Sequence, residues 1–281
     1  MNLVREVRVT ADDGFTLFPL SCIHWPLTSR KMLDRWLEAV TDTPNSQVLL
    51  LGDQFEGTRT SYRAFLRGYA KDTNSKQTFD TLMEAQVDEL VGKLEPIKDK
   101  IIGVIQGNHY YEFFGDLTSD QLLCQRLKIP FLGVEAGIRL ECRDKSGKSR
   151  ATLLLAAHHH GGSSGGKTFG GDINALHKFE QVWDADIFCL GHTHKTLTFM
   201  SGQKTIPKQG DVTEGLRKRV FLRCGCMRDH SPEVAEAAVA YNPDYAKMDS
   251  YAPIPLSWPE LKVQVDFRTG EPRYTRTVVE P

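Results

Sequence analysis

Apolar runs alternate with amphipathic stretches along the first two thirds of the chain. Short continuous apolar runs suit strands buried on both faces, and they predict strands at 15–23, 47–53, 101–108, 150–158 and 185–192. Apolar residues at helical spacing predict helices at 29–40, 119–127 and 172–183, and a longer one across 61–95 that is broken near 72–75. Ser119 is a suitable N-cap for the helix at 119–127. This alternation of strands and helices favours an α/β fold.

The pattern becomes richer in strands toward the C-terminus. Segments 137–143 and 150–158 flank the turn sequence DKSGKS and predict a hairpin. Further strand-like segments lie at 197–202, 204–208, 219–227, 261–267 and 273–279. We therefore expect one domain over residues 1–281, built as a two-sheet β-sandwich flanked by helices. Its motif-bearing core is expected at about 15–200, and its β-rich C-terminal part at 201–281.

Charge and length limit the classes of function. The chain has 281 residues, with 35 Lys and Arg against 36 Asp and Glu, so its formal net charge is −1. This balance disfavours a nucleic-acid coat protein, whose affinity depends on an excess of cations. A local basic stretch (Arg59, Arg63, Arg67 and Lys71) leaves a nuclease open, although a solvated helix face explains it more simply. Because we find neither an apolar run of ~18–20 residues nor a secretory signal, we expect a cytoplasmic protein without a membrane partner.

Six cysteines are scattered without the spacing of a disulfide framework, so we expect reduced thiols. Cys224 and Cys226 lie within the apolar run FLRCGCM. Strand packing is therefore a simpler explanation for this pair than metal binding.

Polar residues follow the predicted buried strands at the point where each strand ends. They occur in CIH at 22–24, GDQFE at 52–56, GNHY at 107–110, HHH at 158–160 and GHTH at 191–194. Ligands of α/β sheets bind at the carboxyl ends of the strands. Loops that supply Asp, Asn and several His there provide what a site for two divalent ions requires.

In order and spacing, these segments resemble the motifs of the calcineurin-like metallophosphoesterase family. The family pattern is D-x-H, G-D-x-x-D, G-N-H-D/E, a strand-end His and G-H-x-H, and the resemblance covers about residues 15–200. GNHYYE, with the helix and the segment PFLG that follow it, is also similar to phage- or prophage-borne members. The resemblance implies a phosphoester hydrolase with two divalent ions (Mn, Zn, Fe or Ni) that activate a water for attack on phosphorus.

The resemblance also implies a role for each matching residue. The first ion would be held by His24, Asp53 and His194, with Cys22 at the position of the family's first Asp. The second ion would be held by Asp53, Asn108, His192 and one histidine of the HHH run. Asp53 would therefore bridge the two ions. His109 would lie beside the substrate phosphate and act in catalysis without binding metal.

Three positions depart from the family pattern. Cys22 either packs inward, which leaves the first ion without a ligand, or supplies a thiolate that tilts this site toward zinc or iron. Glu56 replaces the last carboxylate of G-D-x-x-D. Tyr110 follows His109 where an acid is usual, so the partner that orients His109 is not evident from the motif.

The triple histidine and the glycine-rich segment after it leave alternatives open. We predict His159 as the metal ligand, with His160 or His158 as alternatives, and His160 as a residue that faces the substrate. Segment 161–168 matches the phosphate-binding pattern G-x-x-x-x-G-K-[ST]. The three histidines before it, and a next strand that ends in Gly-His instead of an acid for magnesium, disfavour a nucleotide site. We instead expect a flap beside the metal site that offers Lys167 to a phosphate.

The sequence thus predicts a phosphatase or phosphodiesterase that acts on a phosphoester substrate. One alternative is a nuclease acting on nucleic acid, which the balanced charge disfavours. The other is a non-catalytic scaffold of the same fold, in which Cys22 has broken the site.

Overall fold

Strands and helices alternate through most of the chain, and strands dominate after the last helix. The computed structural model describes residues 4–9, 14–57, 73–113, 116–144, 146–159, 169–205, 215–228, 256–265, 267 and 272–280. The strands are β1 (Val4–Val9), β2 (Phe15–Leu20), β3 (Ser46–Leu51), β4 (Ile101–Ile105), β5 (Phe131–Gly133), β6 (Glu135–Arg143), β7 (Ser149–Ala157), β8 (Ile187–Leu190), β9 (Leu197–Thr205), β10 (Gly215–Arg223), β11 (Trp258–Val265) and β12 (Pro272–Val279). The helices are α1 (Arg30–Asp42), α3 (Thr73–Leu94), the 3-10 helix η1 (Glu95–Lys100), α4 (Ser119–Leu127) and α5 (Phe169–Val182).

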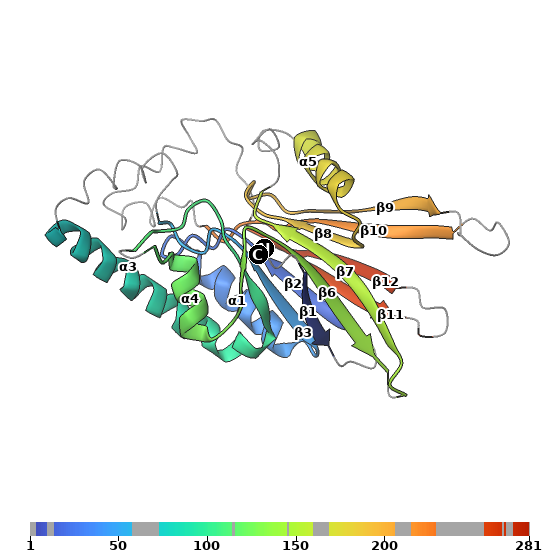
Figure 1. Ribbon diagram of the computed structural model, residues 1–281, viewed down its shortest axis with the longest axis horizontal. Coiled ribbons are helices and arrows are strands. Elements are labelled where there is room, and N and C mark those ends of the chain that lie inside the picture. The colour runs from blue at the N-terminus through green and yellow to red at the C-terminus, as the bar shows by residue number, and fades with distance from the viewer. Residues whose placement is uncertain are drawn as a thin grey trace.

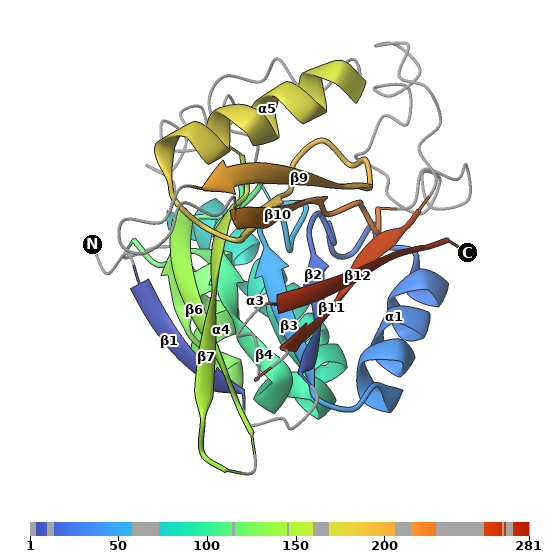
Figure 2. The same ribbon diagram turned by 90° about the vertical axis from the view of Figure 1, so that its right-hand side faces the viewer.

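The strands form two six-stranded mixed sheets (Figures 1 and 2). The first sheet has the order β1-β6-β7-β8-β10-β9, and the second has the order β12-β11-β2-β3-β4-β5. In the first sheet β7, β8 and β10 are parallel neighbours. In the second sheet β2, β3, β4 and β5 are parallel neighbours. Parallel strands end at the same edge of their sheet, so each sheet gathers several strand-end loops at one edge.

The core lies in three layers between and outside the sheets. Leu49 of β3 and Leu154 of β7 belong to a cluster between the two sheets. Leu50, the next residue of β3, points to the opposite face and belongs to a cluster with residues of α1, α3 and α4. On the outer face of the other sheet, Phe179 of α5 packs with Phe188 of β8. Central strands are therefore buried on both faces, which explains their continuous apolar runs.

The predicted α/β class, with two sheets flanked by helices, is confirmed. The predicted hairpin corresponds to β6 and β7, which pair antiparallel. The basic stretch at 59–71, the first part of the helix predicted at 61–95, and the glycine-rich segment 161–168 lie outside the described residues. Within the described part of the chain, we find every helix too short or too polar to span a membrane.

The N-cap of α4 is Thr118 and not the predicted Ser119. The hydroxyl of Thr118 accepts a hydrogen bond from the backbone N–H of Gln121, and the Gln121 side chain accepts one from the backbone N–H of Thr118. This reciprocal pair requires Gln three residues after the cap, which selects Thr118 over its neighbour. Ser119 accepts a hydrogen bond from the backbone N–H of Tyr111 instead.

All six cysteines are buried and unbridged. Cys224 packs in the core between the sheets, as expected from the apolar run around it. Cys226 lies a few residues past the end of β10, where its backbone forms an isolated antiparallel β-bridge with that of Ser257.

Candidate metal centre

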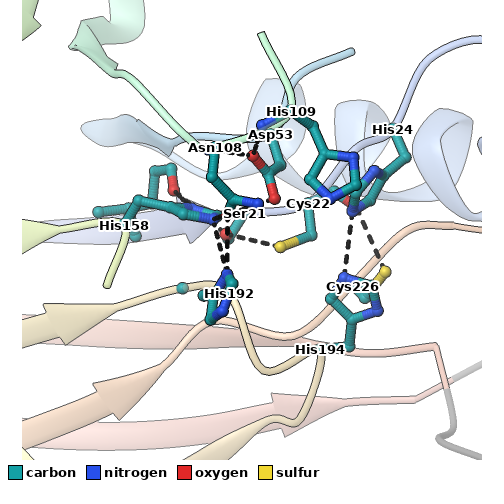
Figure 3. A network of polar contacts seen from close by, with 12 residues as sticks. Ser21, Cys22, His24, Asp53, Asn108, His109, His158, His192, His194 and Cys226 are labelled. Carbon is teal, nitrogen blue, oxygen red and sulfur yellow. Dashed lines mark hydrogen bonds and ion pairs between the residues drawn. The ribbon is translucent and has the colours of Figure 1, made fainter. Parts of the chain in front are cut away.

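Loops from the two sheets meet at the carboxyl ends of their parallel strands (Figure 3). The loops after β2, β3 and β4 carry Cys22, His24, Asp53, Asn108 and His109. The loops after β7 and β8 carry His158, His192 and His194. Figure 3 shows these side chains pointing toward one another across the space between the sheets. The site is therefore assembled from both sheets.

A left-handed backbone is common to most of the predicted ligands. It occurs at Cys22 (φ 55°), His24 (φ 55°), Asp53 (φ 53°), His192 (φ 76°) and His194 (φ 62°). Residues other than glycine rarely adopt this conformation, which costs of order 1–3 kcal/mol each where the surroundings impose it. Strain of this kind concentrates at functional sites. The native fold therefore contains backbone strain at five residues that follow the ends of their strands.

Two motif glycines allow the loops to approach one another. A Cβ on Gly107 would lie 2.1 Å from both the backbone nitrogen and Oδ1 of Asp53. A Cβ on Gly191 would lie 2.1 Å from Oγ of Ser21. Any side chain at these positions would separate the loops, so only glycine fits.

Asp53, Asn108, His158 and His192 form one ligand group, called here the His158 group. Nδ1 of His158 donates to the carbonyl oxygen of Leu51 at 2.7 Å, which leaves Nε2 facing the group. Nε2 lies 3.0 Å from Oδ2 of Asp53 and 3.0 Å from Oδ1 of Asn108. Nδ1 of His192 lies 2.9 Å from the same Asn108 oxygen and 3.3 Å from Nε2 of His158. Two nitrogen and two oxygen atoms thus converge on one point.

Cys22, His24 and His194 form a second group, called here the His24 group. Nδ1 of His24 lies 2.6 Å from Oε2 of Glu56, so Nε2 is the nitrogen that faces the group. This Nε2 lies 3.1 Å from Nε2 of His194. Potential ligand atoms of all three residues lie within 4.8 Å of one another.

Glu56 lies between two histidines and an arginine. Its Oε2 contacts His24 and lies 3.2 Å from Nη1 of Arg228, whereas its Oε1 lies 3.5 Å from Nδ1 of His109. The ring of His109 packs edge-on against that of His24, with centroids 5.0 Å apart. His109 therefore takes its acidic partner from Glu56, and not from residue 110, where the family pattern has an acid.

Both carboxylates of the site are ionised. Burial would raise the pKa of Asp53, but the charge and hydrogen bond of His158 hold this pKa well below its usual range. Burial would also raise the pKa of Glu56, but hydrogen bonds from His109 and His24 hold it far below its usual range. Each carboxylate thus keeps its negative charge in a buried position.

The imidazoles and the thiol respond differently to burial. Burial and the neighbouring His158 lower the pKa of His192 to about 4, and burial lowers the pKa of His24 despite the nearby Glu56. Both rings are therefore neutral at pH 7, which is the form that binds metal. Burial raises the pKa of the Cys22 thiol, so this group is protonated until a cation replaces its proton.

Most of the predicted site residues lie close together. The predicted metal ligands that the structure brings together are Cys22, His24, Asp53, Asn108, His192 and His194. His109, predicted as the catalytic residue, lies beside them. The predicted substrate-binding residues His160 and Lys167 lie outside the described residues.

The structure places His158, not the predicted ligand His159, in the ligand group. His158 is buried, whereas His159 is exposed and its ring lies 5.3 Å from that of His192, centroid to centroid. The pairing of β7 with β8 sets this register, because the backbone N–H of Gly191 donates to the carbonyl oxygen of His158 at 3.0 Å. The first histidine after β7 therefore faces the other ligands.

Substitution of each of the two neighbouring histidines tests which of them is the metal ligand. We expect His158→Ala to lose one metal ion per chain, because it removes the nitrogen that faces Asp53 and Asn108. His159→Ala serves as the matched control and keeps the metal content of the wild type. Metal analysis of both purified variants measures the effect. Loss of metal from His159→Ala alone would return the ligand role to His159.

A buried ion network behind the GHTH loop was not evident from the sequence. Asp172 of α5 is fully buried, and its Oδ2 lies 3.2 Å from Nζ of Lys195, the residue after His194. Its Oδ1 lies 3.5 Å from Nε of Arg223, whose Nη1 donates to the carbonyl oxygen of Gly191 at 2.8 Å. The network thus anchors both ends of the loop that carries two predicted ligands. These partners are far apart in the chain, so local sequence patterns give no sign of them.

We expect Asp172→Asn to weaken metal binding by about 10–100-fold, the usual effect of removing a group that orients ligands. The amide cannot balance the charges of Lys195 and Arg223, so the loop between them loses its fixed position. Asp184→Asn is the matched control, because it removes ion pairs with Arg217 and Arg219 on the same sheet. Calorimetric titration with Zn²⁺ measures the affinity. Equal affinities for both variants would limit Asp172 to a structural role.

Comparisons with known proteins give only distant similarities. We find that no protein-family model matches the sequence and that no curated protein matches it. Vps29 from Cryptosporidium parvum aligns over 96% of this chain and 100% of its own, with 14% identity and a TM-score of 0.43. Zn²⁺-bound Vps29 from Entamoeba histolytica aligns over 94% and 99%, with 15% identity and a TM-score of 0.38. A predicted phosphoesterase from Streptococcus pneumoniae aligns over 95% and 100%, with 11% identity and a TM-score of 0.34.

Similarity at this level assigns neither a family nor an activity to the chain. None of these comparisons supports the resemblance to phage-borne members.

Proposed function

We propose that this protein is a metal-dependent phosphoester hydrolase. The observation that carries the proposal is the convergence of buried and half-buried imidazole, carboxylate, amide and thiol groups from strand-end loops of both sheets. Several of these residues have a left-handed backbone, which costs folding energy and is typical of a functional site. Two adjacent ligand groups suit a pair of divalent ions, the arrangement used for in-line displacement at phosphorus.

The chemistry of the donor atoms fits divalent cations. In the His158 group, the imidazole nitrogens of His158 and His192 face the side-chain oxygens of Asp53 and Asn108, and one cation would satisfy all four atoms. We propose this group as one site, with His158 in place of the predicted His159, and the His24 group as the other. Nitrogen, oxygen and sulfur ligands together suit Zn, Fe, Mn or Ni. When bound, such ions lower the pKa of a coordinated water and neutralise phosphate oxygens.

His109 is the proposed catalytic residue. Glu56 lies on the Nδ1 side of its ring, so Nε2 is the atom that gives a proton to the leaving oxygen of the ester. Glu56 is a positioning residue. It also contacts His24 and Arg228, and these contacts hold its carboxylate in place beside the His109 ring. Asp53 fixes the backbone, since its Oδ1 accepts from the N–H groups of Asn108 and His109 at 2.7 and 2.8 Å.

A metal and substrate screen tests the proposal. Metal-free protein is reconstituted with Mn²⁺, Zn²⁺, Fe²⁺ or Ni²⁺ and assayed on an aryl phosphate monoester, an aryl diester, a cyclic diester and an oligonucleotide. We expect about two ions per chain and hydrolysis of at least one small ester. Chelation should abolish the activity, and return of the metal should restore it.

The same screen separates the alternatives. A nuclease would cleave the oligonucleotide and lose activity steeply as salt rises, because its binding depends on phosphate contacts. A scaffold would bind fewer than one ion per chain and hydrolyse none of the substrates under any metal. That last result would overturn the proposed function.

A further inference from the structure

Cys22 lies close to ligand atoms of both the His24 group and the His158 group. Among the described residues, three sets of His, Cys, Asp or Glu side chains bring one potential ligand atom each within 4.8 Å of one another. Cys22 belongs to two of these sets, one with His24 and His194 and one with Asp53 and His158. Figure 3 shows its sulfur between the histidines of the two groups. The geometry thus gives the thiol, and not only Asp53, access to both.

Asp53 is less suited to serve both groups. Its Oδ1 is engaged by the backbone N–H groups of Asn108 and His109 at 2.7 and 2.8 Å. Its Oδ2 lies 3.0 Å from Nε2 of His158. One oxygen is therefore left for a cation, and this oxygen faces the His158 group.

The surroundings of Cys22 fix its sulfur in place. The side chain is fully buried, and the residue has a left-handed backbone with φ 55°. Oγ of Ser21 lies 3.1 Å from Sγ of Cys22 and 3.2 Å from the carbonyl oxygen of Leu51. The backbone carbonyl of Cys22 accepts from Sγ of Cys226 at 3.4 Å. These contacts hold the sulfur between the groups instead of within the apolar core.

We propose that the Cys22 thiolate bridges the two cation sites, an inference that rests on the proposed function. A zinc–sulfur bond of ~2.3 Å lets one sulfur reach two ions up to about 4.6 Å apart. Paired catalytic ions lie ~3.5–4 Å apart, which is within this reach. When the bonds form, the thiol proton passes to solvent and the sulfur gives one lone pair to each ion. A negative sulfur between two dications reduces their repulsion, and it favours soft cations such as Zn²⁺, Co²⁺ and Cd²⁺ over Mg²⁺.

Cobalt titration of the metal-free wild type tests the bridge without any substitution. A sulfur-to-cobalt charge-transfer band reports each Co²⁺ bound to the thiolate. We expect this band to change with the first equivalent and again with the second. A band that responds to one equivalent only would show a terminal thiolate and overturn the bridge. Two bound ions without any such band would also overturn it.

Cadmium NMR of matched variants gives an independent measurement. We expect wild-type protein loaded with ¹¹³Cd to show two resonances, and Cys22→Asp to move both of them upfield, because a carboxylate replaces the sulfur of each ion. Cys124→Ala, which removes a buried thiol from the core formed with the helices, is the control and keeps both resonances in place. If Cys22→Asp moves a single resonance, the thiolate serves one site only and the proposal fails.

Failure of the bridge is distinguishable from failure of the proposed function. A protein that binds two ions and hydrolyses an ester, but shows sulfur bonded to one ion or none, retains the function without the bridge. A protein that binds no Co²⁺ or Cd²⁺ under any condition overturns both.

Discussion

Asp53→Asn is expected to be the most damaging single substitution in the site. Loss of a general acid typically lowers turnover by about 10²–10⁴-fold, and we expect a larger loss of ester hydrolysis here. The carboxylate supplies the negative charge of the His158 group, and its Oδ1 holds the backbone of Asn108 and His109. A neutral amide leaves adjacent dications with less compensation for their repulsion. We therefore expect loss of an ion together with loss of turnover, measured by metal analysis and steady-state kinetics.

The control for charge removal is Asp34→Asn. Asp34 is exposed and pairs with Lys93 at 2.9 Å, and it belongs to neither ligand group. This variant should keep wild-type metal content and turnover, because exposed ion pairs contribute little. Retention of both ions and most activity in Asp53→Asn itself would contradict the central place given to this carboxylate.

His109→Ala is expected to leave the metal content intact and lower turnover by about 10²–10⁴-fold, the usual contribution of general acid–base catalysis. The ring lies beside His24 and Glu56 and forms a third set of close potential ligand atoms with them, but neither the His158 group nor the His24 group includes it. Glu56→Gln should have a smaller effect of about 10–100-fold, because the proton donor remains but is held less firmly. Turnover and metal content are measured on the same preparations.

His177→Ala is the matched control for removal of an imidazole. His177 lies on α5 and contacts Glu180, outside the strand-end loops. Wild-type turnover is expected. Loss of metal together with activity in His109→Ala would show that His109 is itself a ligand, which would reverse the role assigned to it.

The sequence predicts the fold and most of the residues that meet in the site, because strand ends carry a recognisable local pattern. Short apolar strands followed by Gly-Asp, Gly-Asn-His or Gly-His mark where the chain turns at the edge of a sheet. The packing of Gly107 against Asp53 and of Gly191 against Ser21 explains why glycine occurs at these turns. Such information is local, so it is readable from one sequence.

The features that the sequence did not predict depend on contacts between distant segments. Three consecutive histidines do not show which of them faces the site. The pairing of β7 with β8 places His158 there. Asp172 meets Arg223 and Lys195 only after α5 packs on its sheet. The cap at Thr118 is an intermediate case, since its capping box was present in the sequence.

The division of the ligand groups between two sheets has a consequence for folding. His24 and His194 lie 170 positions apart in the chain, yet their Nε2 atoms are separated by 3.1 Å. A chain with only one sheet formed cannot assemble either group, so a cation held by these groups would bind the native state and not its precursors. At a free concentration of 100 times its Kd, such a cation stabilises the native state by about 2.7 kcal/mol. Metal supply would then set the lifetime of the protein as well as its activity, and chelation would expose the chain to proteolysis.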